Sequence, residues 1–291
     1  MPPSRPLPGK DMIRRITARL GAFLLALLAF SPALAADKPL EFGVFPNLSA
    51  RTVVALYQPL RVYLEKRLGR PVNIYTAPDF KVFVQRSLKR EYDFLVAAPH
   101  FARLAQQEAG YRPLAVYSRE LRAILVVAKD GPVKSVADLK GQAVALPDPI
   151  ALMSMFAVQL LRDGGLRPEK DVTLTNARSH DNAVSSVVHG DSAAAATSAA
   201  PLAQMPDELK NKVRILATSD KTPHQIFMAS PRLSAAETEG LGKLLLDFAA
   251  TPEGRRFIET NKFGGIRPIT EAELKQLDPY AAEVKRMLDI R

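Results

Sequence analysis

The sequence predicts an α/β protein of two similar lobes, each a mostly parallel sheet flanked by helices. Apolar strands alternate with helices along the chain, a rhythm typical of parallel sheets with right-handed crossovers. One pattern occurs twice, at residues 83–99 and 183–199: a helix that ends abruptly, then an acidic residue, then a short strand of small residues. Two segments, at 121–130 and 224–230, lead out of the first unit and back to it. They predict two crossings, and hence a hinge, with a paired ribbon near 121–128 and 224–230.

The first unit is expected to contain three strands and three helices. Ser49 is a candidate helix N-cap, Gly69 a helix stop, and Pro99 a first helical residue. Apolar residues recur at helical spacing between Ser49 and Gly69. The strands are expected at 40–46, 71–77 and 92–99, and the helices at 49–69, 81–90 and 100–110.

The second unit and the remaining chain continue this alternation. A short helix and a strand are expected within 133–148, and Gly164 and Gly165 end the helix that follows. Two helices near the C-terminus are expected to pack back onto the first lobe, and a third ends the helical part of the chain. The second-unit elements are a helix at 151–165, a strand at 171–177, a helix at 180–190 and a strand at 192–199, and the final helices are 234–250, 251–261 and 269–277.

Residues 1–35 are predicted to be a cleaved secretory signal peptide. Arg14, Arg15 and Arg19 precede the ten-residue apolar run at 21–30, and a small-residue cleavage pattern ends at Ala35. The alternative is a membrane anchor, but a spanning helix needs about 20 apolar residues. We therefore expect export to a bacterial periplasm.

Composition excludes several kinds of function. The 291 residues contain no cysteine, which rules out disulfides, Cys-ligated zinc, a Cys nucleophile and a lipoprotein anchor. Without residues 1–35 the chain has 35 basic and 29 acidic residues, a net charge of +6. These charges are scattered, so no nucleic-acid partner is expected.

Four stretches, at 42–80, 135–149, 179–196 and 250–274, resemble periplasmic solute-binding proteins of the phosphate, phosphite and phosphonate ABC transporter family. The resemblance implies a type II periplasmic binding protein fold that delivers a small ligand to an ABC permease in the inner membrane. It also implies a monomer without cofactor or catalytic residues. The signal peptide is expected at 1–35, the first part of the first lobe at 36–122 and the second lobe at 123–223. Residues 224–291 are expected to cross back through the hinge and complete the first lobe.

The chain departs from the family where ligands are held. After Asp148 and Pro149 the family has a Ser/Thr-rich turn with a glycine, and this chain has the apolar residues 150–153. Phe80 replaces a tyrosine, and residues 197–201 (TSAAP) supply no carboxylate. His224 stands where an acid would bind an amine. Each lost charge-assisted hydrogen bond is worth about 1.5–3 kcal/mol, so an aminophosphonate is not expected, and a ligand with more carbon and less charge fits better.

Ten residues are the candidate ligand contacts. The first lobe is expected to supply Ser49, Arg51, Phe80 and His100, the second lobe Ile150, Ala151, His180, Thr197 and Ser198, and the hinge region His224. For the three histidines, ligand contact, metal binding and helix capping remain open, and we assign no metal. Arg51 is alternatively a surface residue of the first helical turn.

Two other functions remain open at this point. The same fold can serve a receptor or histidine kinase as a ligand-sensing protein rather than a permease. An enzyme of this fold would need a dedicated nucleophile, and none is clear. The sequence Gly190-Asp191-Ser192 lacks the glycines and the His/Asp partners of a serine hydrolase.

Overall fold

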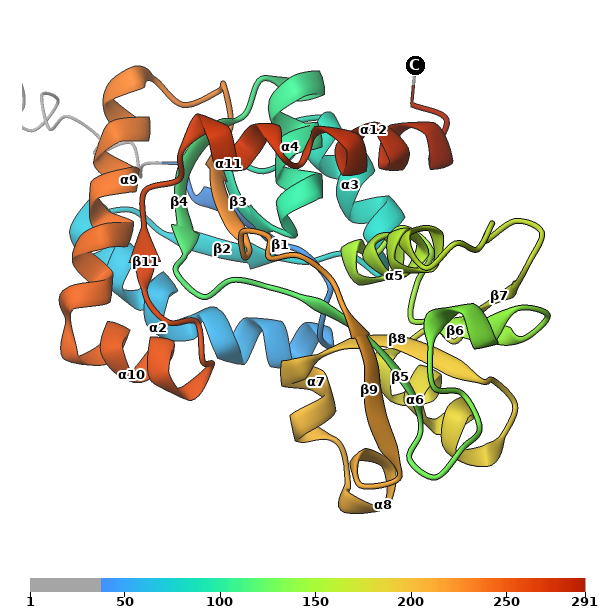
Figure 1. The fold of residues 1–291 in the computed structure, drawn as a ribbon. Helices are drawn as coiled ribbons and strands as arrows, with labels where there is room; N and C mark the ends of the chain where they lie inside the picture. The colour runs from blue at the N-terminus through green and yellow to red at the C-terminus, as the bar shows by residue number, and fades with distance from the viewer. Residues whose placement is uncertain (1–37, 291) are drawn as a thin grey trace, which may run out of the picture. The chain divides into compact units, whose positions relative to one another are not determined.

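The computed structural model describes residues 38–290, and the predicted signal peptide lies outside this range. Within it, the first of two sheets has six strands in the order β11-β4-β10-β3-β1-β2 (Figure 1). β1 pairs in parallel with β2 and β3, whereas β10 is antiparallel to β3 and β4. The strands are β1 (Leu40–Val44), β2 (Val72–Tyr75), β3 (Phe94–Ala97), β4 (Arg112–Tyr117), β10 (Ile226–Ala229) and β11 (Ile266–Arg267).

The second sheet has five strands in the order β7-β6-β8-β5-β9. β6 pairs in parallel with β7 and β8, and β5 is antiparallel to its neighbours β8 and β9. Thus one strand, β5, runs against the other four. The strands are β5 (Ala123–Ala128), β6 (Ala143–Leu146), β7 (Thr173–Asn176), β8 (Ala194–Ser198) and β9 (Val213–Thr218).

Helices follow most of the parallel strands, at positions close to those expected from the sequence. Ser49 caps α2 by accepting from the Thr52 backbone N–H, Gly69 ends it in the left-handed conformation, and Pro99 opens α4. The helices are α2 (Ala50–Leu68), α3 (Phe80–Leu88), α4 (Pro99–Ala109), η1 (Val136–Leu139), α5 (Leu152–Asp163), α6 (His180–His189), α7 (Ala199–Gln204), α8 (Asp207–Lys210), α9 (Ala235–Ala250), α10 (Pro252–Thr260), α11 (Glu271–Lys275) and α12 (Asp278–Met287).

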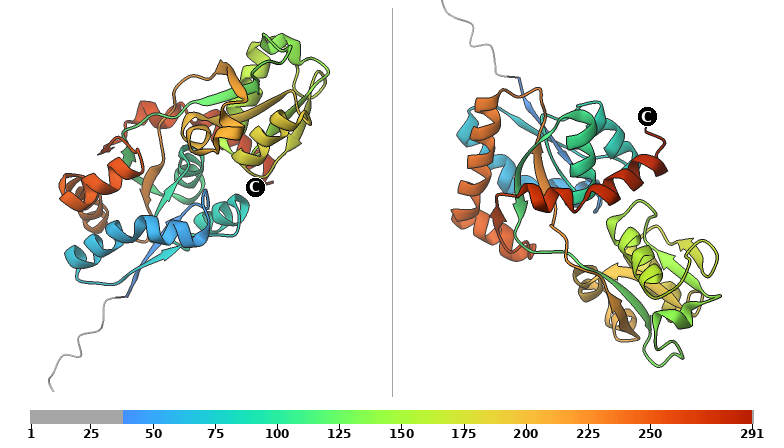
Figure 2. Two further views of the ribbon diagram at one scale, coloured as in Figure 1. Left: turned by 90° about the horizontal axis from the view of Figure 1, so that it is seen from below. Right: turned by 45° about the horizontal axis from the view of Figure 1, so that its top comes forward.

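Two segments join the sheets, one between β4 and β5 and one between β9 and β10, and both can be followed in Figure 2. They meet in one antiparallel bridge, in which Leu121 and Thr222 exchange backbone hydrogen bonds of 2.9 and 3.0 Å. The expected ribbon of 121–128 with 224–230 is therefore wrong in its pairing. β5 lies inside the second sheet and β10 inside the first, because each completes its hydrogen bonds with strands of its own sheet.

Each sheet has an apolar cluster on each face. In the first lobe, α2, α9 and α10 cover one face of the six-stranded sheet, and α3, α4 and α12 lie on the other. In the second lobe, α5 and α6 contribute to different clusters. Ile150 and Met155, which follow β6 of the second sheet, belong to the first-lobe cluster around Phe45 and Phe101. The lobes thus share one apolar contact region.

No helix among residues 38–290 is long and apolar enough to cross a membrane.

Candidate functional site

Five helices of eight or more residues follow parallel strands of the two sheets. Side chains cap the N-termini of three of these helices. Ser49 caps α2, Asp79 caps α3 and Ser179 caps α6, each by accepting from a backbone N–H of the first turn. The cap positions of α4 and α5 are Ala98 and Ala151, which have no side-chain acceptor. These two helices therefore retain first-turn N–H groups, and the partial positive charge of a helix N-terminus, for another partner.

A hydrogen bond joins these two uncapped helix ends across the lobes. The imidazole Nε2 of His100, on α4, lies 2.9 Å from the carbonyl oxygen of Ile150, which precedes α5. A carbonyl only accepts, so Nε2 carries the proton and donates. His100 is fully buried, and its Nδ1 has no hydrogen-bond partner among the described residues. The ring is therefore a neutral donor that ties the second lobe to the first.

The side chains around this bond are apolar. Ile150 is 8% exposed and belongs to the cluster of Phe45 and Phe101. The Phe80 ring lies between these two phenylalanines, with centroids 6.1 Å from Phe45 and 5.6 Å from Phe101, and His100 stacks on Phe101 at 4.1 Å. The apolar turn that replaces the family's hydroxyls thus packs against first-lobe aromatic rings.

One carboxylate lies at the α5 N-terminus, and a second caps α3. Asp148 accepts from the Ile150 backbone N–H at 3.0 Å, and Asp79 accepts from Val82 at 2.7 Å. Burial raises the pKa of Asp148, and the charge of Asp79 raises it further. The second effect requires the two acids to be close enough to repel each other. This part of the site is consequently unfavourable for a second negative charge.

A polar pair lies at the carboxyl end of β8. His180 Nδ1 and Thr197 Oγ1 are 3.1 Å apart, and Thr197 is fully buried. Burial lowers the pKa of His180, which favours its neutral form. Ser198, next to Thr197, is 9% exposed. These residues offer hydroxyl and imidazole groups on the second-lobe side.

The other candidates lie in different surroundings. Ser49 and Arg51 are exposed at the start of α2, where the Ser49 hydroxyl is already used as a cap. His224 lies on the returning segment, edge-on to the rings of Tyr117 and Phe263 at 5.6 Å each. It lies close in sequence to the crossing at Thr222, and its ring contacts are with aromatic side chains.

Sequence reasoning missed four contributors to this region. Asp79 lies within the family-like stretch 42–80, where nothing marks it as a site residue, and Phe45 and Phe101 fit the pattern of ordinary core residues. Ser154 has a buried hydroxyl without a partner among the described residues, in the first turn of α5. The absence of Ser, Thr, Asp or Asn at both Ala98 and Ala151 is the signal that could have identified the uncapped ends. Within residues 38–290 no three His, Asp or Glu side chains are placed to hold a metal ion.

The buried histidines give the protein a predictable response to acid. Burial lowers the pKa of both His100 and His224 to about 4, and nearby Arg119 adds to the effect at His224. A histidine in the unfolded chain has a pKa near 6.5. Between pH 6.5 and pH 4 the unfolded chain therefore binds more protons than the folded protein, and the free energy of unfolding falls as the pH falls. The loss is at most about 3 kcal/mol per histidine.

Urea unfolding between pH 7 and pH 4 measures this response. His224→Phe should flatten the profile, whereas His189→Gln, at an exposed histidine of α6, should not. A wild-type profile that is flat down to pH 4 would contradict the expectation. The raised pKa of Asp148 acts in the opposite direction and partly offsets the loss.

Two helix-flanked sheets are joined by two crossings, and two uncapped helix ends meet between them. This architecture defines a bilobal ligand-binding protein with the type II periplasmic binding protein fold. The family model described as the periplasmic substrate-binding protein of phosphonate ABC transporters matches residues 42–274, so the chain belongs to this family. It is therefore the solute-binding component of an ABC transporter, in a family of binding proteins rather than enzymes.

Solved structures agree on the fold. A Xanthomonas citri protein bound to ATP is 21% identical, with a TM-score of 0.72 over 87% of this chain and 99% of that one. The methylphosphonate complex of a Prochlorococcus marinus protein is 12% identical, with a TM-score of 0.74 over 86% and 99%. The aliphatic sulphonate binding protein of Escherichia coli is 18% identical, with a TM-score of 0.58 over 86% and 88%.

Proposed function

We propose that the protein captures a small monoanion with an alkyl group, of the aliphatic sulfonate type, between its lobes and delivers it to an ABC permease. In this proposal residues 1–35 are cleaved during export. The first lobe comprises 36–122 with 224–291, and the second comprises 123–223. The protein acts in the periplasm as a monomer, without catalysis. The observation that carries the proposal is the contact between the uncapped N-termini of α4 and α5 through His100 and Ile150.

The negative charge of the ligand follows from these helix ends. Both helices are long enough to have a full N-terminal partial charge, and neither has a side-chain cap. Backbone N–H groups at such ends bind oxyanions without a cationic side chain. Arg51, the one cation among the ten candidates, is exposed at the start of α2. A ligand held mainly by backbone groups suits a single, delocalised negative charge.

The side chains at the inter-lobe site favour a ligand that carries an alkyl group and only one negative charge. Ile150 and Phe80 provide apolar surface, and the neighbouring acids Asp79 and Asp148 disfavour a dianion. A sulfonate stays monoanionic at neutral pH, whereas phosphate and phosphonates approach a second charge. His180, Thr197 and Ser198 are proposed to donate to the oxygens from the second lobe. His224 is proposed to contribute to ligand binding through the hinge, and Ser49 through the α2 cap. Ala151 is proposed to contribute through its backbone.

Binding is proposed to work by population shift. A ligand that contacts both lobes binds the closed arrangement better than an open one, and the bridge between Leu121 and Thr222 marks the hinge. The closed form then docks on the permease.

A calorimetric titration series tests the ligand class. Butane-1-sulfonate should bind at least about tenfold more tightly than butylphosphonate, phosphate or 2-aminoethylphosphonate, because one unfavourable charge contact is worth about 1.4 kcal/mol or more. The same order should appear in thermal shifts at saturating ligand. Tightest binding of 2-aminoethylphosphonate would refute the proposal, and so would binding of none of the four. Native mass spectrometry of protein purified from its host would then identify the retained ligand.

A further inference from the structure

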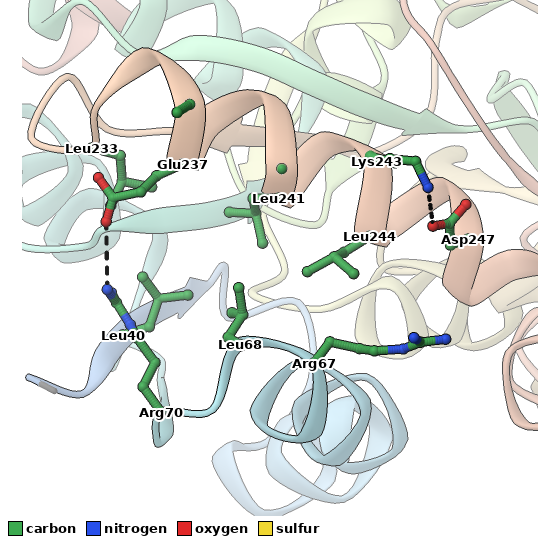
Figure 3. Close-up of a pocket in the computed structure, with 12 residues that line it drawn as sticks. Leu40, Arg67, Leu68, Arg70, Leu233, Glu237, Leu241, Lys243, Leu244 and Asp247 are labelled. Carbon is green, nitrogen blue, oxygen red and sulfur yellow. Dashed lines mark hydrogen bonds and ion pairs between the residues drawn. The ribbon is translucent and has the colours of Figure 1, made fainter. Parts of the chain in front are cut away.

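A groove outside the inter-lobe region lies on the first lobe, between the end of α2 and α9. Its volume is about 610 Å³. Figure 3 shows leucines of α9 facing the end of α2 and the start of β1, with charged side chains along the edge. The apolar lining residues are Leu40, Leu68, Leu233, Leu241 and Leu244.

The helix α9 carries a glycine, Gly240, in its interior where it lines the groove. A Cβ atom built on Gly240 would meet no atom within 4 Å, so no neighbour requires a glycine there. In a helix interior glycine costs about 1 kcal/mol relative to alanine. Gly242, on the same helix, lies in ordinary contact with Leu114. A larger side chain at Gly240 would therefore extend into open space at the groove, beside the buried Leu241.

The charges at the edge leave positive groups available. Arg70 pairs with Glu237 at 3.5 Å, and Lys243 pairs with Asp247 at 2.8 Å. Arg67 makes no ion pair with residues 38–290, and its guanidinium lies 5.4 Å from the centre of the Tyr63 ring. The Nε of Arg70 is buried and has no hydrogen-bond partner among the described residues. One unpaired cation and one unused donor therefore adjoin the leucines.

We propose that this groove binds a single-chain anionic amphiphile, with its alkyl chain along the leucines and its carboxylate at Arg67. The apolar lining favours an alkyl chain over a polar solute. The unpaired guanidinium favours an anionic head group over a neutral or cationic one, because a carboxylate accepts charge-assisted hydrogen bonds from arginine. This site is separate from the proposed inter-lobe site, and its residues contribute to neither α4 nor α5.

Binding of dodecanoate below its aggregation concentration tests the head-group preference. One molecule should bind per chain, and dodecan-1-ol and dodecyltrimethylammonium should bind at least about tenfold more weakly. Equal binding of the alcohol would overturn the proposal, since the Arg67 guanidinium would then have no role. Binding to anionic phosphatidylglycerol vesicles without binding of free dodecanoate would also overturn it, in favour of a membrane surface.

Variants locate the site. Gly240→Leu fills the groove and improves helix propensity, so it should fold and yet reduce dodecanoate affinity at least about tenfold. Arg67→Ala should reduce affinity about tenfold and Arg67→Lys less, whereas Lys66→Ala, the neighbouring cation outside the groove, should not change it. Unchanged affinity in Gly240→Leu would overturn the proposal. Ile150→Ala separates the two sites, because it should affect butane-1-sulfonate but not dodecanoate.

Discussion

Replacing Ile150 with alanine should weaken butane-1-sulfonate binding about 30- to 150-fold, which corresponds to about 2–3 kcal/mol of lost packing. Ile150 belongs in sequence to the second lobe, yet its side chain is buried in the first-lobe cluster of Phe45 and Phe101. The lost packing therefore reduces the population of the closed arrangement rather than the stability of either lobe. Calorimetry measures the affinity, and urea unfolding measures the stability.

Leu161→Ala is the matched control for this prediction. Leu161 is fully buried on α5 in a cluster made of second-lobe residues. Its truncation should lower the free energy of unfolding by about 2–5 kcal/mol and leave the affinity nearly unchanged. If Ile150→Ala instead strengthens binding, the side chain occupies the ligand's place, and the contact competes with the ligand rather than supporting it.

Replacing His100 with phenylalanine should weaken the same binding about 5- to 150-fold, because the buried Ile150 carbonyl loses its donor at a cost of about 1–3 kcal/mol. Phenylalanine keeps a ring that can stack on Phe101, so the packing of α4 changes little. The hydrogen bond is the one imidazole contact between the lobes in the described residues. His100→Gln, which retains an N–H donor, should recover part of the affinity.

His224→Phe provides the comparison at another buried histidine. That ring lies edge-on to the stacked rings of Tyr117 and Phe263, and its Nδ1 has no partner among the described residues. The substitution removes no contact between α4 and α5, so the loss of affinity should be smaller than in His100→Phe. Equal losses in His100→Phe and His224→Phe would show that burial of a ring, and not the hydrogen bond to Ile150, supports closure.

Local signals in the sequence placed most of the helices correctly. Ser49 and Gly69 bracket α2, and Ser179 and Gly190 bracket α6, because capping depends on hydrogen bonds within a few residues. β4, β9 and α12 were not assigned. In β9 the exposure alternates irregularly and Ile215 is 52% exposed, so the segment has no clear strand pattern. Its position is fixed by pairing with β5, which a local pattern does not reveal.

The candidate site was predicted in part. The sequence placed His100 and Ile150 at helix starts on opposite lobes, and the structure brings their polar atoms within hydrogen-bonding distance. The sequence did not indicate that His100 would bond to a backbone carbonyl, because every residue has one. It also gave no sign that Asp79 and Asp148 approach each other, since their separation depends on how the two lobes meet.

The sequence by itself determined the α/β class, the family, most of the helix boundaries and the loss of the hydroxyl-rich turn. Only the tertiary structure decided that β10 lies between β3 and β4, that β5 lies between β8 and β9, and that the crossings meet at Leu121 and Thr222. It also decided that the apolar turn at Ile150 packs on the opposite lobe. Caps and periodicity act over a few residues, whereas strand neighbours and lobe contacts depend on which distant surfaces bury each other.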